Sequence, residues 1–319
     1  MIDLADITTT ADRIAGHVIR TPSVSSPGLS ETLGVPVTAK LELLQHTGSF
    51  KVRGAAAKLL NLAPRELARG VVAVSGGNHA IAVAAIAAAM GVKATVVMPR
   101  SAPRRAAEAA ERSGADVRVT DDMAGAFALA GRLRDEGMVL VHPFDDPLVV
   151  AGQGTVGLEL AEDAGDLTDV IVSIGGGGLI SGIAVALRAL RPGVRVWGVE
   201  TAGADAMSRA LAAGAPVPAE LSSIVSTLSA PMVSQLTYEH VSALVEDVIV
   251  VSDEQAVQGT LEIANQAKLW AEPAAGCLIP AARQVIEKTG DSVRLGLVLC
   301  GGNVTFRDVE TWSRQFALE

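Results

Sequence analysis

The sequence is poor in aromatic residues and cysteine and has no cluster of positive charge. Aromatic residues make up 3% of its 319 residues, and the two cysteines, Cys277 and Cys300, lack metal-ligand spacing. Two isolated cysteines favour a reduced, cytoplasmic setting over a disulfide framework. The net charge is −9 and the longest basic run is Arg104-Arg105, so nucleic acid is not expected as a partner.

Long apolar segments are also missing. The longest one, from Ala80 to Val92, includes Gly91 and is too short to span a bilayer, so it is predicted to be a buried helix. The first residues, Met1 to Asp6, are acidic where a secretion signal would carry positive charge. We therefore expect a soluble protein that does not bind membranes.

Small and aliphatic residues are abundant, since 49% of the residues are hydrophobic and 32 are glycine. Short β-branched segments alternate with alanine-rich helical segments almost throughout. Strands are predicted at 71–74, 94–98, 117–119, 138–141, 170–174, 194–199, 248–251 and 294–299. Helices are predicted at 79–90, 104–112, 123–134, 152–161, 179–190, 254–268 and 273–288. This alternation predicts an α/β fold with mostly parallel sheets and helices on both faces.

No low-complexity linker marks a domain boundary. The strand–helix units between residues 54 and 147 suffice for a small open sheet, so we predict a small domain at 54–147. Residues 1–53 and 148–319 would form the large domain. Because open α/β sheets bind ligands at the carboxyl ends of their strands, the active site is expected in the cleft between the two domains.

Two motifs together point to one cofactor. Most lysines are solvated surface charges, but Lys51 lies in the partly apolar segment Thr47–Gly54, where desolvation would free its amine as a nucleophile. About 120 residues later, Gly175–Gly178 follows a predicted strand and opens a helix, where backbone N–H groups can hold an anion. The glycines match neither a nucleotide phosphate loop nor a full dinucleotide fingerprint. An amine and a bed for a small phosphate predict pyridoxal phosphate, which is both an aldehyde and a phosphate.

Two further motifs lie where predicted strands end. In Ser75-Gly76-Gly77-Asn78-His79, Ser75 and the following amides could hold a carboxylate and Asn78 a ring hydroxyl, although helix capping explains the same residues. His79 taken alone is more often structural than a base. In Cys300-Gly301-Gly302-Asn303, the thiol could touch a pyridine nitrogen, or Cys300 could be a small buried apolar residue.

Taken together, these motifs resemble the fold-type II pyridoxal-phosphate enzymes, in particular the serine/threonine dehydratase and serine racemase group. The similarity covers nearly the whole chain and includes 48–54, 75–79, 144–147, 151–155, 175–178, 199–200, 272–274 and 300–303. The resemblance implies a two-domain fold like that of the tryptophan synthase β chain. Each domain would be an open, mostly parallel sheet flanked by helices.

The resemblance also implies a role for each candidate residue. Lys51 would form the Schiff base with the cofactor and later act as the base at Cα, while Asn78 would bond the 3′-oxygen of the ring. The cofactor site would consist of Phe50, Lys51, Asn78, Gly175, Gly176, Gly177, Gly178, Leu179 and Cys300. The substrate carboxylate would be lined by Thr47, Ser75, Asn78 and His79.

The residue at position 300 bears on the reaction. A thiol beside the pyridine nitrogen cannot stabilise a pyridinium as an aspartate would, so the ring stays neutral and is a weaker electron sink. A weak sink suits loss of the Cα proton and the β-hydroxyl in close succession. The predicted reaction is β-elimination from a β-hydroxy amino acid, L-threonine or L-serine first, to a 2-oxo acid and ammonia. The resemblance further implies a homodimer acting on this small-molecule substrate.

Departures from the family pattern leave alternatives open. Racemases of the group carry a second serine where Gly76 stands, so racemisation is expected to be poor, but a serine racemase stays the second enzyme class. Ser226-Thr227 replaces a frequent Asp-Gly, which allows hydroxyaspartate or another β-hydroxy amino acid, such as a hydroxyectoine-derived compound, as the substrate. A non-catalytic metabolite-binding protein is a third class. The divalent-cation site of some relatives corresponds to Glu200, Ala204 and Ala206 here, with the acidic Asp205 displaced by one position.

Overall fold

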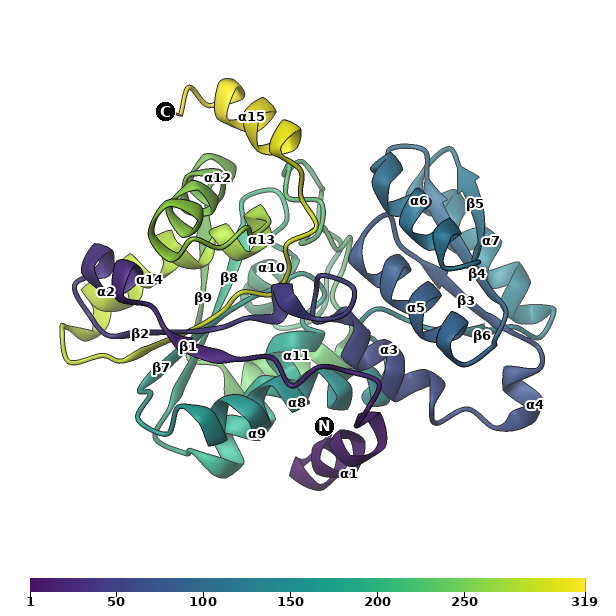
Figure 1. Cartoon of the computed structure of the whole chain (residues 1–319), viewed down its shortest axis with the longest axis horizontal. Coiled ribbons are helices and arrows are strands. Elements are labelled where there is room, and N and C mark those ends of the chain that lie inside the picture. Colours follow the sequence, from purple (N-terminus) through teal and green to yellow (C-terminus); the bar gives the residue numbers. More distant parts are fainter. Residues whose placement is uncertain (319) are drawn as a thin grey trace.

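The computed structural model describes residues 1–318 and contains two sheets that lie side by side (Figure 1). The six-stranded sheet has the order β1-β2-β10-β7-β8-β9 and is parallel except for the pairing of β1 with β2. Its strands are β1 (Ser23–Ser25), β2 (Val37–Lys40), β7 (Asp169–Ser173), β8 (Arg195–Thr201), β9 (Asp247–Val251) and β10 (Leu295–Val298).

The four-stranded sheet has the order β5-β4-β3-β6 and is parallel throughout. Its strands are β3 (Val71–Val74), β4 (Ala94–Pro99), β5 (Asp116–Thr120) and β6 (Val139–Leu140). The central strands β3 and β4 are buried along their whole length, which explains why their sequences are continuous apolar runs. The predicted parallel α/β architecture is confirmed.

Helices cover the faces of both sheets, as Figure 1 shows. Those that surround the six-stranded sheet are α1 (Leu4–Ile14), α2 (Pro27–Leu33), α8 (Pro147–Asp163), α9 (Gly178–Leu190), α10 (Ala206–Ala213), α11 (Gln235–Leu244), α12 (Asp253–Glu262), α13 (Pro273–Gly276), α14 (Leu278–Thr289) and α15 (Phe306–Gln315), with the short turns η1 (Glu42–Leu44) and η2 (Ile263–Ala267). The remaining helices are α3 (Lys51–Leu59), α4 (Pro64–Leu67), α5 (Asn78–Ala89), α6 (Arg104–Arg112) and α7 (Met123–Asp135). No helix in residues 1–318 is long and apolar enough to cross a membrane.

All eight predicted strands are present, and the main errors concern helix ends and the first 60 residues. The helix predicted at 152–161 begins earlier, at Pro147, because the side chain of Asp146 accepts the Leu148 N–H at 2.9 Å and Pro147 occupies the first helical position. The predicted helix at 273–288 is broken at Cys277 into α13 and α14. The prediction missed β1, β2, α1, α2 and α3 in the first 60 residues, and also α4, α10, α11 and α15.

The helix α3 joins the two sheets. It packs against α5, which covers the four-stranded sheet, and against α8, which belongs to the six-stranded one. All four strands of the smaller sheet lie inside the predicted 54–147 segment, while α3 runs across the predicted limit at residues 53 and 54. The carboxyl ends of β3, β7 and β10 carry the motifs that begin at Ser75, Gly175 and Cys300, so the fold places the candidate site between the sheets.

Candidate active site

Lys51 is the first residue of α3, and the loop before it is fixed to the end of β10. The Gly302 N–H donates to the Gly48 carbonyl at 2.9 Å and the Phe50 N–H donates to the Cys300 carbonyl at 3.0 Å. Gly48 has a φ of +72°, and a Cβ there would lie 2.4 Å from Asn303 Oδ1. Only glycine fits this turn, and the turn brings the lysine motif and the Cys300 motif together.

The amine of Lys51 is held in a desolvated position. Its Nζ lies 3.3 Å from the carbonyl oxygen of Pro143 and 5.0 Å from the ring centroid of Phe50. Burial lowers the pKa of Lys51 to about 8, although nearby Cys300 and Glu272 oppose this shift. A substantial fraction of the amine is therefore neutral near physiological pH, as a nucleophile or a base requires.

The glycine turn Gly175–Gly178 forms a cradle without side chains at the start of α9. Gly177 has a φ of +90° and is the N-cap, and a Cβ at Gly176 would lie 2.0 Å from Phe144 Cδ1. The first N–H groups of a helix have no carbonyl partner within it, and its N-terminus favours anions. Leu179 follows, buried in the core. The glycine turn thus lies at a helix N-terminus, with Phe144 packed against Gly176, and its role as an anion site stays a prediction.

Asn78 is held by two residues to which the sequence analysis gave no role. Its Nδ2 donates to Glu272 Oε1 at 2.9 Å, and its Oδ1 accepts from Asn303 Nδ2 at 2.7 Å. Asn303 Nδ2 also donates to the Thr47 carbonyl at 2.8 Å. Glu272 is buried, and burial raises its pKa to about 7. Because Glu272 precedes Pro273 at a helix start, the sequence suggests only an N-cap. Its contact with Asn78 is not visible in the local sequence, since the two residues are 194 positions apart.

Substituting Glu272 by glutamine is expected to change how stability depends on pH. Because burial raises the pKa of Glu272 from 4.5 to about 7, the folded protein keeps a proton that the unfolded chain loses in this interval. The free energy of unfolding of the wild type should therefore fall as the pH rises from 4.5 to about 7. Each unit by which the pKa is raised corresponds to about 1.4 kcal/mol. The glutamine variant has no titrating group here and should not show this fall. Thermal unfolding of both proteins from about pH 5 to about pH 8 measures the difference, and parallel profiles would contradict a buried acid here.

The other predicted substrate residues surround the same point. Ser75 Oγ accepts the Gly77 N–H at 3.1 Å, and His79 Nε2 lies 2.8 Å from the Val141 carbonyl. Burial lowers the pKa of His79 to about 3, so the imidazole is neutral and ties α5 to the end of β6. Thr47 Oγ1, Ser49 Oγ and His79 Nδ1 are buried and have no hydrogen-bond partner within residues 1–318. Buried polar atoms are normally paired, so these atoms mark a place for a polar ligand.

Cys300 lies at the end of β10 and is buried. Burial raises the pKa of its thiol well above the usual range, so the sulfur is protonated and neutral. Neither Cys300 nor Cys277 forms a disulfide in the described chain. The structure therefore places a neutral thiol beside the Lys51 loop.

Glu200, singled out from the sequence as a potential cation ligand, has a different use. Its Oε1 accepts the Met207 N–H at 2.8 Å, and its Oε2 accepts the Ser208 N–H at 2.8 Å and the Ser208 hydroxyl at 2.7 Å. Asp205 instead pairs with Arg209 at 2.9 Å. Residues 1–318 contain no group of three or more histidine, cysteine, aspartate or glutamate side chains placed to hold a metal. Helix capping accounts for this buried carboxylate, and we propose no cation for Ala204 and its neighbours.

A buried network of ion pairs holds the start of α3, the helix that carries Lys51. Arg53, two residues after Lys51, has a fully buried side chain that donates to Glu42 Oε2 at 2.8 Å and to Glu159 Oε1 at 2.6 Å. Lys40 on β2 donates to Glu159 Oε2 at 2.6 Å and to the Thr21 carbonyl at 2.7 Å. These pairs connect α3 with β2, η1 and α8, so they fix the helix that carries Lys51 to the larger sheet.

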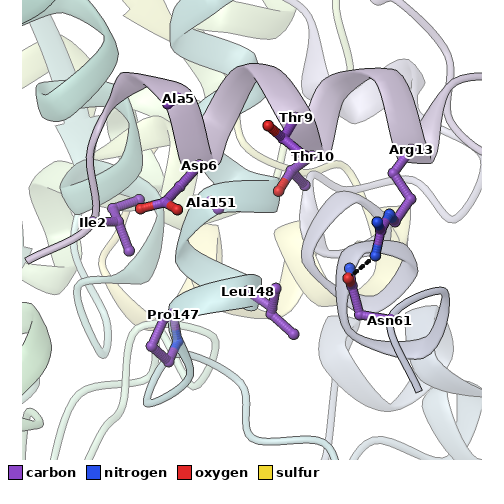
Figure 2. Close-up of a pocket in the computed structure, with 10 residues that line it drawn as sticks. All are labelled: Ile2, Ala5, Asp6, Thr9, Thr10, Arg13, Asn61, Pro147, Leu148 and Ala151. Atoms are coloured by element: carbon purple, nitrogen blue, oxygen red, sulfur yellow. Dashed lines mark hydrogen bonds between the residues drawn. The ribbon is translucent and has the colours of Figure 1, made fainter. Parts of the chain in front are cut away.

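The structure has two notable cavities, and they differ in their relation to these residues. One, of about 260 Å³, is lined by Gly76, Gly77 and Asn78 and by residues of α6. The other, of about 250 Å³, lies between α1 and α8, and the side chains of Arg13 and Asn61 hydrogen-bond at one end of it (Figure 2). None of the predicted site residues lines this second cavity. The candidate active site is therefore next to the first cavity.

Comparison with known proteins gives matches along almost the whole chain. A family model described as pyridoxal-phosphate dependent enzyme matches residues 14–301. An L-threonine ammonia-lyase from Thermotoga maritima is 39% identical over 307 residues, which cover 95% of this chain and 76% of the relative. A phenylserine dehydratase from Ralstonia pickettii is 37% identical over 318 residues and is covered to 97%. Maize serine racemase has a TM-score of 0.91 at 34% identity and covers 99% of this chain, with 97% of its own chain covered.

Proposed function

The chain belongs to the pyridoxal-phosphate-dependent enzymes, and we propose that it is an ammonia-lyase acting on a β-hydroxy amino acid. The proposed reaction removes the β-hydroxyl and then the amino group, and it releases a 2-oxo acid and ammonia. L-Threonine and L-serine are the first candidate substrates, and the relative named L-threonine ammonia-lyase supports this choice. The observation that carries the proposal is the desolvated amine of Lys51, held beside the neutral thiol of Cys300.

The residues at the site fit the cofactor of this family. Gly175–Gly178 carries no side chains at the N-terminus of α9, where backbone amides can bind a small phosphate, and the Phe144 ring packs against Gly176 so closely that no Cβ fits there. Buried hydroxyls of Thr47 and Ser49 and the Nδ1 of His79 have no partner within residues 1–318 and are available to polar groups. An amine with a pKa of about 8 is suited to an aldehyde.

Each side chain then has a defined task. Pyridoxal phosphate, when bound, supplies the electron sink that acidifies the Cα–H bond of the substrate. Lys51 accepts the Cα proton, because its lowered pKa leaves the amine partly neutral. Asn78, fixed in orientation by Glu272 and Asn303, would present its amide to the 3′-oxygen of the cofactor. Cys300, uncharged, would lie beside the pyridine nitrogen and leave it neutral.

The remaining residues would position the phosphate of the cofactor and the carboxylate of the substrate. Gly175 to Gly178 and Leu179 would hold the phosphate through their backbone N–H groups, and Phe50 would pack beside the ring. The turn from Ser75 to His79 and Thr47 would hold the substrate carboxylate. His79 contributes by position and not by charge, since its imidazole is neutral.

Racemisation is the second candidate function, because maize serine racemase shares the fold at 34% identity. The structure favours elimination at one position. A Cβ at Gly76 would lie 2.9 Å from the Cβ of Ala102, so a serine there would require Ala102 to move. Gly76 itself has no group that can deliver a proton to the face of Cα opposite Lys51.

Incubation of the holoenzyme with L-serine or L-threonine in deuterated water tests the proposal. We expect equal amounts of 2-oxo acid and ammonia, with little α-deuterated amino acid. Accumulation of α-deuterated D-serine without 2-oxo acid would instead identify a racemase. A panel of β-hydroxy amino acids, including threo-3-hydroxyaspartate and phenylserine, then ranks the substrates by their rate of 2-oxo acid release.

We also propose the homodimer expected from the resemblance and the cytoplasmic location expected from the two cysteines. The buried, unpaired Cys277 and Cys300 support a reducing compartment. The proposed domains, 54–147 against 1–53 with 148–319, are supported by the two separate sheets and by the contact of Asn78 with Glu272 across them. Sedimentation of the purified protein would test the dimer.

A further inference from the structure

The cavity of about 260 Å³ next to Asn78 is bounded by four segments of the chain. Gly76, Gly77 and Asn78 form one wall, α6 forms another, and residues 226–227 and 302–304 complete it. The first wall is the turn proposed above to hold the substrate carboxylate. A substrate bound at that turn can therefore extend its side chain into this cavity.

The charged side chains that line this cavity are all positive. Arg105 and Arg112 are its charged lining residues, and no carboxylate of residues 1–318 lines it. They lie seven residues apart on α6, which is two helical turns, so they share one face of the helix. Ala106 and Ala109 line the cavity between them, and their short side chains leave the space open. In a chain with a net charge of −9, this local arrangement favours an anion.

The two arginines differ in how far their charge is already satisfied. Arg105 Nη1 lies 2.9 Å from Asp308 Oδ2 on α15, and its Nε donates to the Asn303 carbonyl at 3.3 Å. Arg112 is exposed and makes no ion pair or side-chain hydrogen bond within residues 1–318. Arg105 is thus anchored near Asn303, and the guanidinium of Arg112 is the one available to a ligand.

We propose, on the premise of the ammonia-lyase function above, that the preferred substrates are β-hydroxy amino acids whose side chain ends in a carboxylate. Arg112 binds this second carboxylate in the cavity lined by α6. Ser226 and Thr227 offer hydroxyl groups and no charge on the opposite wall. Carboxylate recognition by arginine is strong because its planar group can donate two parallel hydrogen bonds.

Steady-state kinetics of the holoenzyme with a matched pair of substrates tests this inference. L-threo-3-hydroxyaspartate and L-threo-3-hydroxyasparagine differ only in the charge of the distal group. We expect the wild type to favour the acid, and Arg112→Gln to lower kcat/KM for the acid by about tenfold or more, mainly through KM. The same substitution should lower kcat/KM much less for hydroxyasparagine, whose distal group carries no charge.

Arg104→Gln is the matched control on the same helix. The Arg104 side chain is 92% exposed, pairs with Glu108 and does not line the cavity. This variant should leave both substrates unchanged. If it lowers kcat/KM for the acid as much as Arg112→Gln does, the effect belongs to the overall charge of the protein and the inference is overturned.

Binding without turnover separates this inference from the proposed function. L-Aspartate and L-asparagine lack the β-hydroxyl, and the change in cofactor absorbance reports their affinity for the holoenzyme. We expect tighter binding of aspartate, a preference that Arg112→Gln removes; equal affinity in the wild type overturns the inference. Release of 2-oxo acid from L-threonine but not from hydroxyaspartate also overturns it, while the proposed function stands. If no β-hydroxy amino acid yields a 2-oxo acid, the proposed function fails first.

Discussion

Replacing Lys51 by alanine is expected to lower the rate of 2-oxo acid release by several orders of magnitude and to leave the fold intact. The lysine is the first residue of α3 and its amine makes one hydrogen bond, to the Pro143 carbonyl at 3.3 Å, so few contacts are lost. General-base proton transfer by a positioned group contributes about 10²–10⁴-fold to an enzymatic rate. The measurement is 2-oxo acid release by the variant and the wild type, with circular dichroism as the check on folding.

Lys93→Ala is the matched control for this variant. Lys93 is exposed and lies just before β4, outside the candidate site, so its loss should leave the rate unchanged. Borohydride reduction followed by peptide mapping should place a pyridoxyl adduct on Lys51 in the wild type. A Lys51→Ala protein that keeps more than about a tenth of the wild-type rate, or an adduct on another lysine, would contradict the assigned role.

Replacing Arg53 by methionine is expected to lower the free energy of unfolding by about 3–5 kcal/mol, the largest stability effect that we foresee. Methionine has a similar side-chain volume, so the substitution removes the positive charge of Arg53 without leaving a large cavity. It leaves the fully buried Glu42 without its ion pair and takes one of two cationic partners from Glu159. Equilibrium unfolding in urea, followed by circular dichroism, measures the difference.

Arg20→Met provides the comparison for Arg53. The Arg20 side chain is 53% exposed and pairs with Glu162 at 3.0 Å and with Asp163, which lies 3.8 Å from Lys40. Surface pairs of this kind contribute about 0–1 kcal/mol, so we expect a small effect from its loss. Equal destabilisation by the two substitutions would show that the buried network has no special contribution.

The elements that could be predicted from the sequence are those whose surroundings are uniform. Val71–Val74 and the core of Ala94–Pro99 are buried on both faces, and a continuous run of apolar residues in the sequence predicts such a strand. The strand β2 was missed because it is short and ends in Lys40, a charged residue that is fully buried. Its burial depends on Glu159, which lies 119 residues away, and no local pattern shows such a partner.

In the candidate site, too, local sequence patterns reveal some residues, while those that depend on distant partners are not recognisable. Lys51 and Gly175–Gly178 stand out in the sequence because a reactive amine and a segment without side chains are both visible in the residues themselves, and their roles stay predictions. Glu272 and Asn303 received no role, because their function is to orient Asn78 from distant parts of the chain. A residue that acts through another residue leaves no signal in a local sequence.

The close approach of position 76 to Ala102 makes these two sites interdependent in evolution. A serine at 76 introduces the opposite-face acid of a racemase, but it meets the Ala102 Cβ at 2.9 Å. A smaller residue at 102 without that serine brings no new chemistry. A serine at 76 therefore requires residue 102 to move or to change with it, so the two positions are coupled through this one contact.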